Sequence, residues 1–125
     1  MTTFHAVVWM DHSEAHVLMF DREHVEAQRI KARSHHTLKH GHVSADKDFF
    51  KQVAQVLEGV SEILVTGPAK AKIEFRDYCK HNAHAVDKAI VDVITSDHPT
   101  DAQVVAMARQ YFVKFDQLAA DPAQR

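Results

Sequence analysis

One segment of the chain combines residue types that could bind an anion. It runs Ile63-Leu-Val-Thr-Gly-Pro-Ala-Lys-Ala-Lys-Ile-Glu-Phe75 and predicts a buried strand, a tight turn at Gly67 and a helix that opens at Pro68. The free N–H groups at a helix start favour anions. A Walker loop is excluded because a second glycine and Gly-Lys-Ser/Thr are missing, so a plain strand–helix junction with solvated lysines is the simpler interpretation. The predicted anion site consists of Thr66, Gly67 and Lys70.

A second segment combines histidines with basic residues. No acidic residue lies between Ala27 and Ala45, and partial protonation of histidine near neutral pH would add to the positive charge there. Such a run could contact phosphate groups. A solvated loop is the alternative, and a metal site is a weaker one because the spacing matches no closed zinc site. The candidate RNA-binding residues are Arg29, Lys31, Arg33, His35, His36, Lys39, His40 and His42.

Two aspartate–histidine pairs follow predicted strands and could face one crevice. Metal-dependent nuclease chemistry needs several carboxylates within a few ångströms, and Asp11 and Asp97 could converge with Asp92 or Asp101. Aspartate in a turn favours local hydrogen bonds, and Asp97 could cap a helix. We therefore expect structural roles for these carboxylates, no bound metal and no catalytic residue. The predicted strand-end crevice consists of Asp11, His12, Asp97 and His98.

Composition narrows the class of protein. The 125 residues fit one domain, and the net charge of -2 argues against a globally basic nucleic-acid binder. The lone Cys79 excludes an internal disulfide and fits a reducing cytoplasm. No apolar run approaches the ~18 residues of a membrane span, and we expect no signal peptide and no cofactor. The sequence is compatible with a homodimer.

Three strands followed by alternating helices and strands must position these residues. Short turns after Met10 and Phe20 predict an antiparallel meander, and the capping box Thr100-Asp-Ala-Gln103 predicts the start of the last helix. The expected strands cover Phe4–Met10, Ala15–Phe20, His24–Ala32, Ile63–Thr66 and Ala89–Ile94, and the expected helices cover Asp46–Glu58, Pro68–Asn82 and a segment from Thr100.

This order predicts a mixed five-stranded α/β sheet of the ribonuclease H-like kind. Right-handed crossovers give the strand order 3-2-1-4-5, with the first three strands antiparallel and the carboxyl ends of strands 1, 4 and 5 at one edge. We expect Trp9, Val65 and Ile94 to be buried. Residues 1–116 should form the single domain, and residues 117–125 a frayed tail.

The chain resembles a known group of translation proteins. Three stretches carry the resemblance, namely Val8-Trp-Met-Asp-His-Ser-Glu-Ala-His16, Val65-Thr-Gly-Pro-Ala-Lys70 and Ser96-Asp-His-Pro-Thr-Asp101. They are similar to small bacterial "translational machinery" proteins and, more remotely, to the middle domain of archaeal and eukaryotic class-I peptide-chain release factors and Pelota. The resemblance covers about Phe4 to Phe115.

One departure from the release factors bears on catalysis. Their Gly-Gly-Gln loop corresponds to Ser34–Ala45, which contains only Gly41 and no glutamine, so peptidyl-tRNA hydrolysis is not implied. The resemblance implies a non-catalytic accessory factor of rescue or hibernation type that binds the ribosome or structured RNA. A metal-dependent nuclease and an anion- or nucleotide-sensing module are the alternatives. We also expect Ser34–Ala45 to be the most mobile internal segment.

Overall fold

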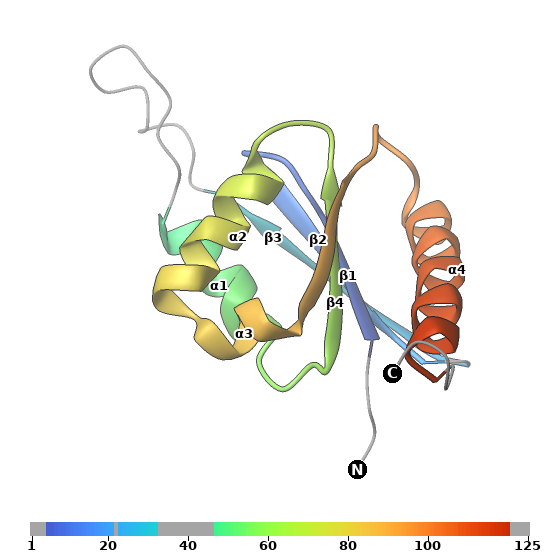
Figure 1. Ribbon diagram of the computed structural model, residues 1–125. Coiled ribbons are helices and arrows are strands. Elements are labelled where there is room, and N and C mark those ends of the chain that lie inside the picture. The colour runs from blue at the N-terminus through green and yellow to red at the C-terminus, as the bar shows by residue number, and fades with distance from the viewer. Residues whose placement is uncertain (1–4, 22, 33–46, 121–125) are drawn as a thin grey trace.

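A central β-sheet carries helices on both faces. The computed structural model describes residues 5–21, 23–32 and 47–120, and of residues 115–120 only the helical backbone. The strands are β1 (His5–Met10), β2 (Glu14–Phe20), β3 (Val25–Lys31), β4 (Glu62–Gly67) and β5 (Ile90–Thr95). The helices are α1 (Lys47–Val56), α2 (Ala71–Asn82), α3 (His84–Ala89) and α4 (Asp101–Ala120). Figure 1 shows α1, α2 and α3 on one face of the sheet and α4 on the other.

The strand order is β3-β2-β1-β4-β5, as the sequence predicts. β1 pairs antiparallel with β2 and parallel with β4. β2 and β3 are antiparallel, whereas β4 and β5 are parallel. The expected mixed five-stranded α/β sheet is therefore confirmed. None of the described helices is long and apolar enough to cross a membrane.

The alternation of side chains along β1 and β2 divides the core into two clusters. On β1, Val8 and Met10 face α1 and α2, while Val7 and Trp9 face α4. Trp9 is 5% exposed, and its indole N–H donates to the Asp97 carbonyl at 2.7 Å. Cys79 is fully buried, and burial, followed by the charge of Asp87, raises the pKa of this thiol to about 12. A packed, inert thiol is the result.

Three local features differ from the sequence-based expectation. α2 begins at Ala71 rather than at Pro68, with Lys70 as the residue that precedes its first turn. The short helix α3 was not expected, since no glycine or proline marks the break at Ala83. Ile94 is only half-buried, since β5 lies at the edge of the sheet. Trp9 and Val65 are buried as expected.

Glycine is required at positions 59 and 67 for different structural reasons. Gly59 has a φ of 86°, a left-handed conformation that suits the end of α1. Gly67 instead ends β4 beside β1, where an added Cβ would lie 2.1 Å from the backbone oxygen of Met10. Close backbone approach, rather than a tight turn, therefore requires glycine at this position.

We predict that Gly67→Ala destabilises the protein by about 1–3 kcal/mol, because the obstructing atom belongs to the backbone and cannot move aside cheaply. Urea denaturation of both proteins measures the difference in the free energy of unfolding. The matched control is Lys70→Ala, an exposed change three residues along the chain, which should alter stability by less than ~0.5 kcal/mol. Equal stability of Gly67→Ala and the parent protein would contradict the proposed close approach.

Candidate nucleic-acid interface

The ends of four strands meet at one edge of the sheet, which we call the carboxyl edge. β1, β4 and β5 are parallel, and β3 runs in the same direction as β1 because two antiparallel pairings separate them. The Ala32 N–H donates to the Ser13 carbonyl at 2.9 Å, which ties the end of β3 to the turn between β1 and β2. The described end of β3, at Ala32, therefore lies at the same edge as the predicted crevice and anion site.

Two of the predicted RNA-binding residues lie on β3. Arg29 and Lys31 are both exposed and, being two residues apart in a strand, share one face. Arg29 lies opposite His16 on β2, and Lys31 lies opposite Glu14. The Arg29 Nε is 3.9 Å from the Glu14 Oε1. Outside the described residues lie the other predicted members, Arg33, His35, His36, Lys39, His40 and His42, together with the Ser34–Ala45 segment expected to be mobile.

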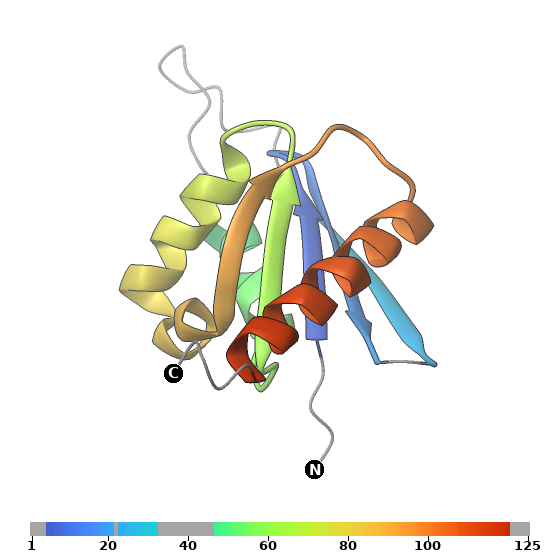
Figure 2. The ribbon, with the colours of Figure 1, turned by 45° about the vertical axis from the view of Figure 1, so that its right-hand side comes forward.

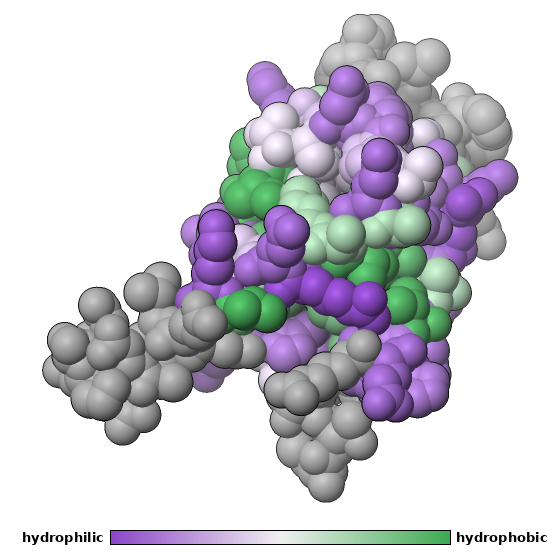
Figure 3. Space-filling model, turned by 90° about the vertical axis from the view of Figure 1, so that its right-hand side faces the viewer, coloured by the Kyte–Doolittle hydropathy of each residue, from purple (hydrophilic) through white to green (hydrophobic). Residues whose placement is uncertain are grey.

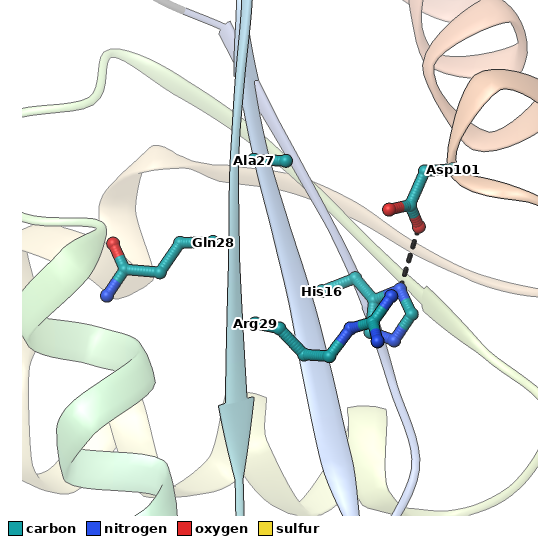
Figure 4. A pocket seen from close by; sticks show the side chains of 5 residues that line it. All are labelled: His16, Ala27, Gln28, Arg29 and Asp101. Carbon is teal, nitrogen blue, oxygen red and sulfur yellow. Dashed lines mark hydrogen bonds and ion pairs between the residues drawn. The ribbon is translucent and has the colours of Figure 1, made fainter.

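His16 links β2 to the first turn of α4. Its Nδ1 lies 2.7 Å from Asp101 Oδ1, and its Nε2 lies 3.0 Å from Glu14 Oε1. Both contacts are hydrogen bonds only when both ring nitrogens carry a proton. Figure 4 shows His16, Arg29 and Asp101 on one side of β3, while Gln28 points to the opposite side. His16 thus links two carboxylates on separate elements and is a structural histidine.

Asp11 is committed to the turn between β1 and β2. Its Oδ1 accepts hydrogen bonds from the Ser13 N–H at 2.8 Å, the Ser13 hydroxyl at 2.8 Å and the Glu14 N–H at 2.9 Å. Burial alone would raise the pKa of Asp11, but these hydrogen bonds, with a smaller contribution from His98, lower it overall. The local role expected for this aspartate is therefore confirmed.

The remaining crevice residues lie along the same edge. His12 Nε2 lies 2.6 Å from Glu74 Oε1 of α2, a long-range pair that no sequence spacing indicates. His98 Nδ1 lies 3.1 Å from Asp97 Oδ1, and the His98 ring lies 5.2 Å from the Trp9 ring. The Asp97 side chain is 98% exposed. The structure thus brings both aspartate–histidine pairs to one edge.

The carboxylates considered for metal chemistry point to separate partners. Asp92 accepts a hydrogen bond from the Tyr111 hydroxyl at 3.1 Å, and Asp101 is held by His16. Over residues 5–21, 23–32 and 47–120, no three His, Cys, Asp or Glu side chains are grouped so that they could hold a metal ion. Asp97 does not cap α4, since Thr100 and Gln103 exchange reciprocal hydrogen bonds of 3.2 and 2.9 Å there. The expected capping box is confirmed.

The predicted anion site has one exposed member. Thr66 is fully buried, and its hydroxyl donates to the Ser96 hydroxyl at 2.7 Å. Gly67 faces the Met10 carbonyl, whereas Lys70 is exposed at the start of α2, where no side chain caps the helix. The sequence gives no sign that Lys72 is 5% exposed, with its ammonium group donating to the Ala69 carbonyl. Lys70 is thus the accessible residue of this predicted site.

We predict that Asp11→Asn removes a pH-dependent contribution to stability. Because the folded-state pKa of Asp11 is lowered, its contribution is present above the unfolded value of ~3.9 and is lost as the pH falls through the folded value. The variant should therefore lose less stability than the parent protein between about pH 5 and pH 2. Urea titrations across this range measure the effect, with exposed Asp97→Asn as the control. Parallel pH profiles for Asp11→Asn and the parent protein would contradict the assignment.

The fold can be compared with known proteins. No protein-family model and no curated protein sequence matches the chain. Among solved structures, Pelota of Archaeoglobus fulgidus has a TM-score of 0.66 at 16% identity, over 95% of this chain and 37% of that one. The archaeal translation termination factor aRF1 has a TM-score of 0.57 at 14% identity, and the match covers 94% of this chain and 41% of aRF1. Archaeal Pelota in a ribosome-bound model with ABCE1 has a TM-score of 0.58 at 23% identity, and the match covers 81% of this chain and 30% of that Pelota chain. The chain spans well under half of each factor, and the predicted resemblance to Pelota and the release factors is confirmed at the level of the fold.

Proposed function

We propose that this protein is a non-catalytic accessory factor of translation that binds the ribosome or structured RNA through the carboxyl edge. The observation that carries the proposal is the position of β3. This strand brings Arg29 and Lys31 toward the edge where the other strands end, and in sequence the strand is followed by further basic residues with no acidic residue before Asp46. A similar fold occurs in Pelota when that protein is bound to the ribosome.

The charges along this edge support phosphate binding. Close to the carboxyl end of β3, Asp11 accepts turn hydrogen bonds, and Glu14 contacts both His16 and Arg29. Glu74 is similarly paired with His12. Arg29 and Lys31 are exposed and lead directly to Arg33. Cations on a strand edge that continue into a basic segment can follow successive phosphates of a nucleic acid.

The proposal that the protein is non-catalytic rests on which residues are present in two places. The segment Ser34–Ala45 has no glutamine and only one glycine, so the Gly-Gly-Gln hydrolysis chemistry of release factors has no counterpart there. The carboxylates considered for a nuclease have separate partners, as described above. A rescue or hibernation role therefore suits a factor that occupies a site on the ribosome rather than one that cleaves a substrate. Lys70 and the start of α2 would contribute a further phosphate contact at the same edge.

We predict that Arg29→Ala/Lys31→Ala weakens co-sedimentation with purified ribosomes and flattens its salt dependence. Loss of two phosphate contacts should reduce the slope of log K against log salt by about 1.4–1.8. Arg33→Ala/Lys39→Ala should act in the same way. Stability should change by less than ~0.5 kcal/mol, because exposed charges contribute little.

The matched control is Lys80→Ala/Lys88→Ala, which removes the same charge from exposed positions at the end of α2 and on α3. These positions lie toward the opposite edge of the sheet, so the control should bind as the parent protein does. If the control variant weakens ribosome binding equally, binding depends on net charge alone, and the proposed interface is overturned. Magnesium- or manganese-dependent RNA cleavage that is abolished by Asp11→Asn/Asp97→Asn would replace the proposal with the nuclease alternative.

A further inference from the structure

The two faces of the sheet are covered unequally. Three helices cover one face, whereas α4 alone crosses the other, and β3 lies beyond its flank (Figure 2). Val25 of β3 is 45% exposed, although it is a large apolar side chain on this side of the sheet. Figure 3 looks at the α4 side and shows hydrophobic surface reaching solvent between hydrophilic side chains. One position for a helix on this face is therefore unfilled by the described residues.

A groove occupies this position, between β3 and α4. It consists of two adjoining hollows of about 290 and 360 Å³, which share Ala27 and Asp101. The apolar lining comes from two layers. The strands contribute Leu18, Val25 and Ala27, and the helix contributes Ala102, Val105 and Ala106. We call this hollow the α4/β3 groove.

The shape of the α4/β3 groove suits a helix. Ala102 and Ala106 are four residues apart and so lie on one flank of α4, where their small side chains let a second helix approach closely. Val113, about two turns further along, is 56% exposed and extends the same flank. An extended peptide paired with the edge of β3 would leave this flank of α4 uncovered. A helix lying beside α4 would cover both walls.

The charges of the groove select the chemistry of that helix. Arg29 lines the hollow near the start of α4, and Arg109 lines the other hollow. The Arg109 guanidinium lies 5.6 Å from the centre of the Phe20 ring and donates to the Asp21 carbonyl at 3.1 Å, so its position is fixed. The acidic lining residue, Asp101, already accepts from His16. Arg29 lies 3.9 Å from Glu14, whereas Arg109 contacts a backbone carbonyl and the Phe20 ring. Arg109 is thus the cation of the groove that acidic residues on an occupant would complement.

We propose that the α4/β3 groove binds an acidic amphipathic α-helix of a protein partner. The apolar stripe of that helix would cover Val25, Ala27 and Ala106, and glutamate or aspartate on its flanks would lie near Arg29 and Arg109. Apart from Arg29, this surface is separate from the proposed phosphate-binding positions, and the proposal does not depend on RNA binding.

A displayed library of 18-residue helical peptides tests the proposal. Every member carries apolar residues at positions i, i+3, i+4 and i+7, and the flanking positions are randomised among acidic, neutral and basic residues. Selection against the full-length protein should enrich acidic peptides. Amide shifts in the ¹⁵N spectrum should then map to Val25, Ala27, Ala102 and Ala106.

The decisive variant is Ala106→Glu, which fills the groove and adds a repulsive charge at an exposed helix position that accepts glutamate readily. It should weaken the selected peptides at least tenfold. The matched control, Ile73→Glu, alters a 58% exposed residue of α2 and should leave binding unchanged. Ala102→Glu provides a second groove variant should Ala106→Glu fail to fold.

Four results would overturn the proposal. The library yields no binder, the enriched peptides are neutral or basic, or binding persists in both groove variants. The fourth is that another occupant claims the groove. Sedimentation would then show a dimer of the parent protein that Ala106→Glu dissociates, or ribosome binding would be lost in Ala106→Glu but retained in Ile73→Glu. A monomeric parent protein and unchanged ribosome binding by Ala106→Glu are the expected results.

Discussion

The pairing of β1 with β4 at the centre of the sheet constrains the rest of the structure. β1 has a hydrogen-bonded strand on each side and packed side chains on both faces, so its residues from Ala6 to Met10 are all buried. Such a strand must be apolar throughout, which is what its sequence shows. The close approach of Gly67 to the Met10 carbonyl then brings the ends of both strands together. The carboxyl edge, with the turn at Asp11 and the start of α2, follows from this one register.

Regular patterns made most of the fold predictable, and long-range contacts made the rest unpredictable. Alternation along β2 and the apolar run of β4 indicated both strands, and the capping box at Thr100 located the start of α4. The reason for Gly67 could not be inferred, because the obstructing Met10 carbonyl is distant in sequence. The break at Ala83 lacked a glycine or proline signal. The hydrogen bonds of Asp11 within its turn could be predicted from the sequence. The contact of His12 with Glu74 could not, because it depends on how α2 packs beside the turn.

The high histidine content has two separate origins. Most described histidines contact a carboxylate. The pairs are His5–Glu62, His12–Glu74, His16 with Glu14 and Asp101, His24–Asp21, His81–Asp77 and His98–Asp97. The histidines between Arg33 and His42 have no acidic neighbour in sequence. Within the first group, His5, His12 and His16 link segments that are distant in sequence, whereas the other three pairs join residues at most four positions apart. Exposed pairs of this kind contribute little stability. The second group lies in a basic segment of a protein whose net charge is -2, and the proposed binding of phosphate would depend on this local excess of positive charge.

Arg29 lies where the two proposed surfaces meet, and its position explains how one small domain could carry both. Its strand continues through Lys31 toward the carboxyl edge, while its own side chain lines the start of the α4/β3 groove. The groove then runs away from that edge along α4, toward Arg109. A nucleic acid at the edge and a helix in the groove would therefore contact different residues except at Arg29. If both bind together, their acidic groups would share one cation there, so each should weaken the other slightly rather than exclude it. Such a coupling between the two sites is by thermodynamic necessity reciprocal.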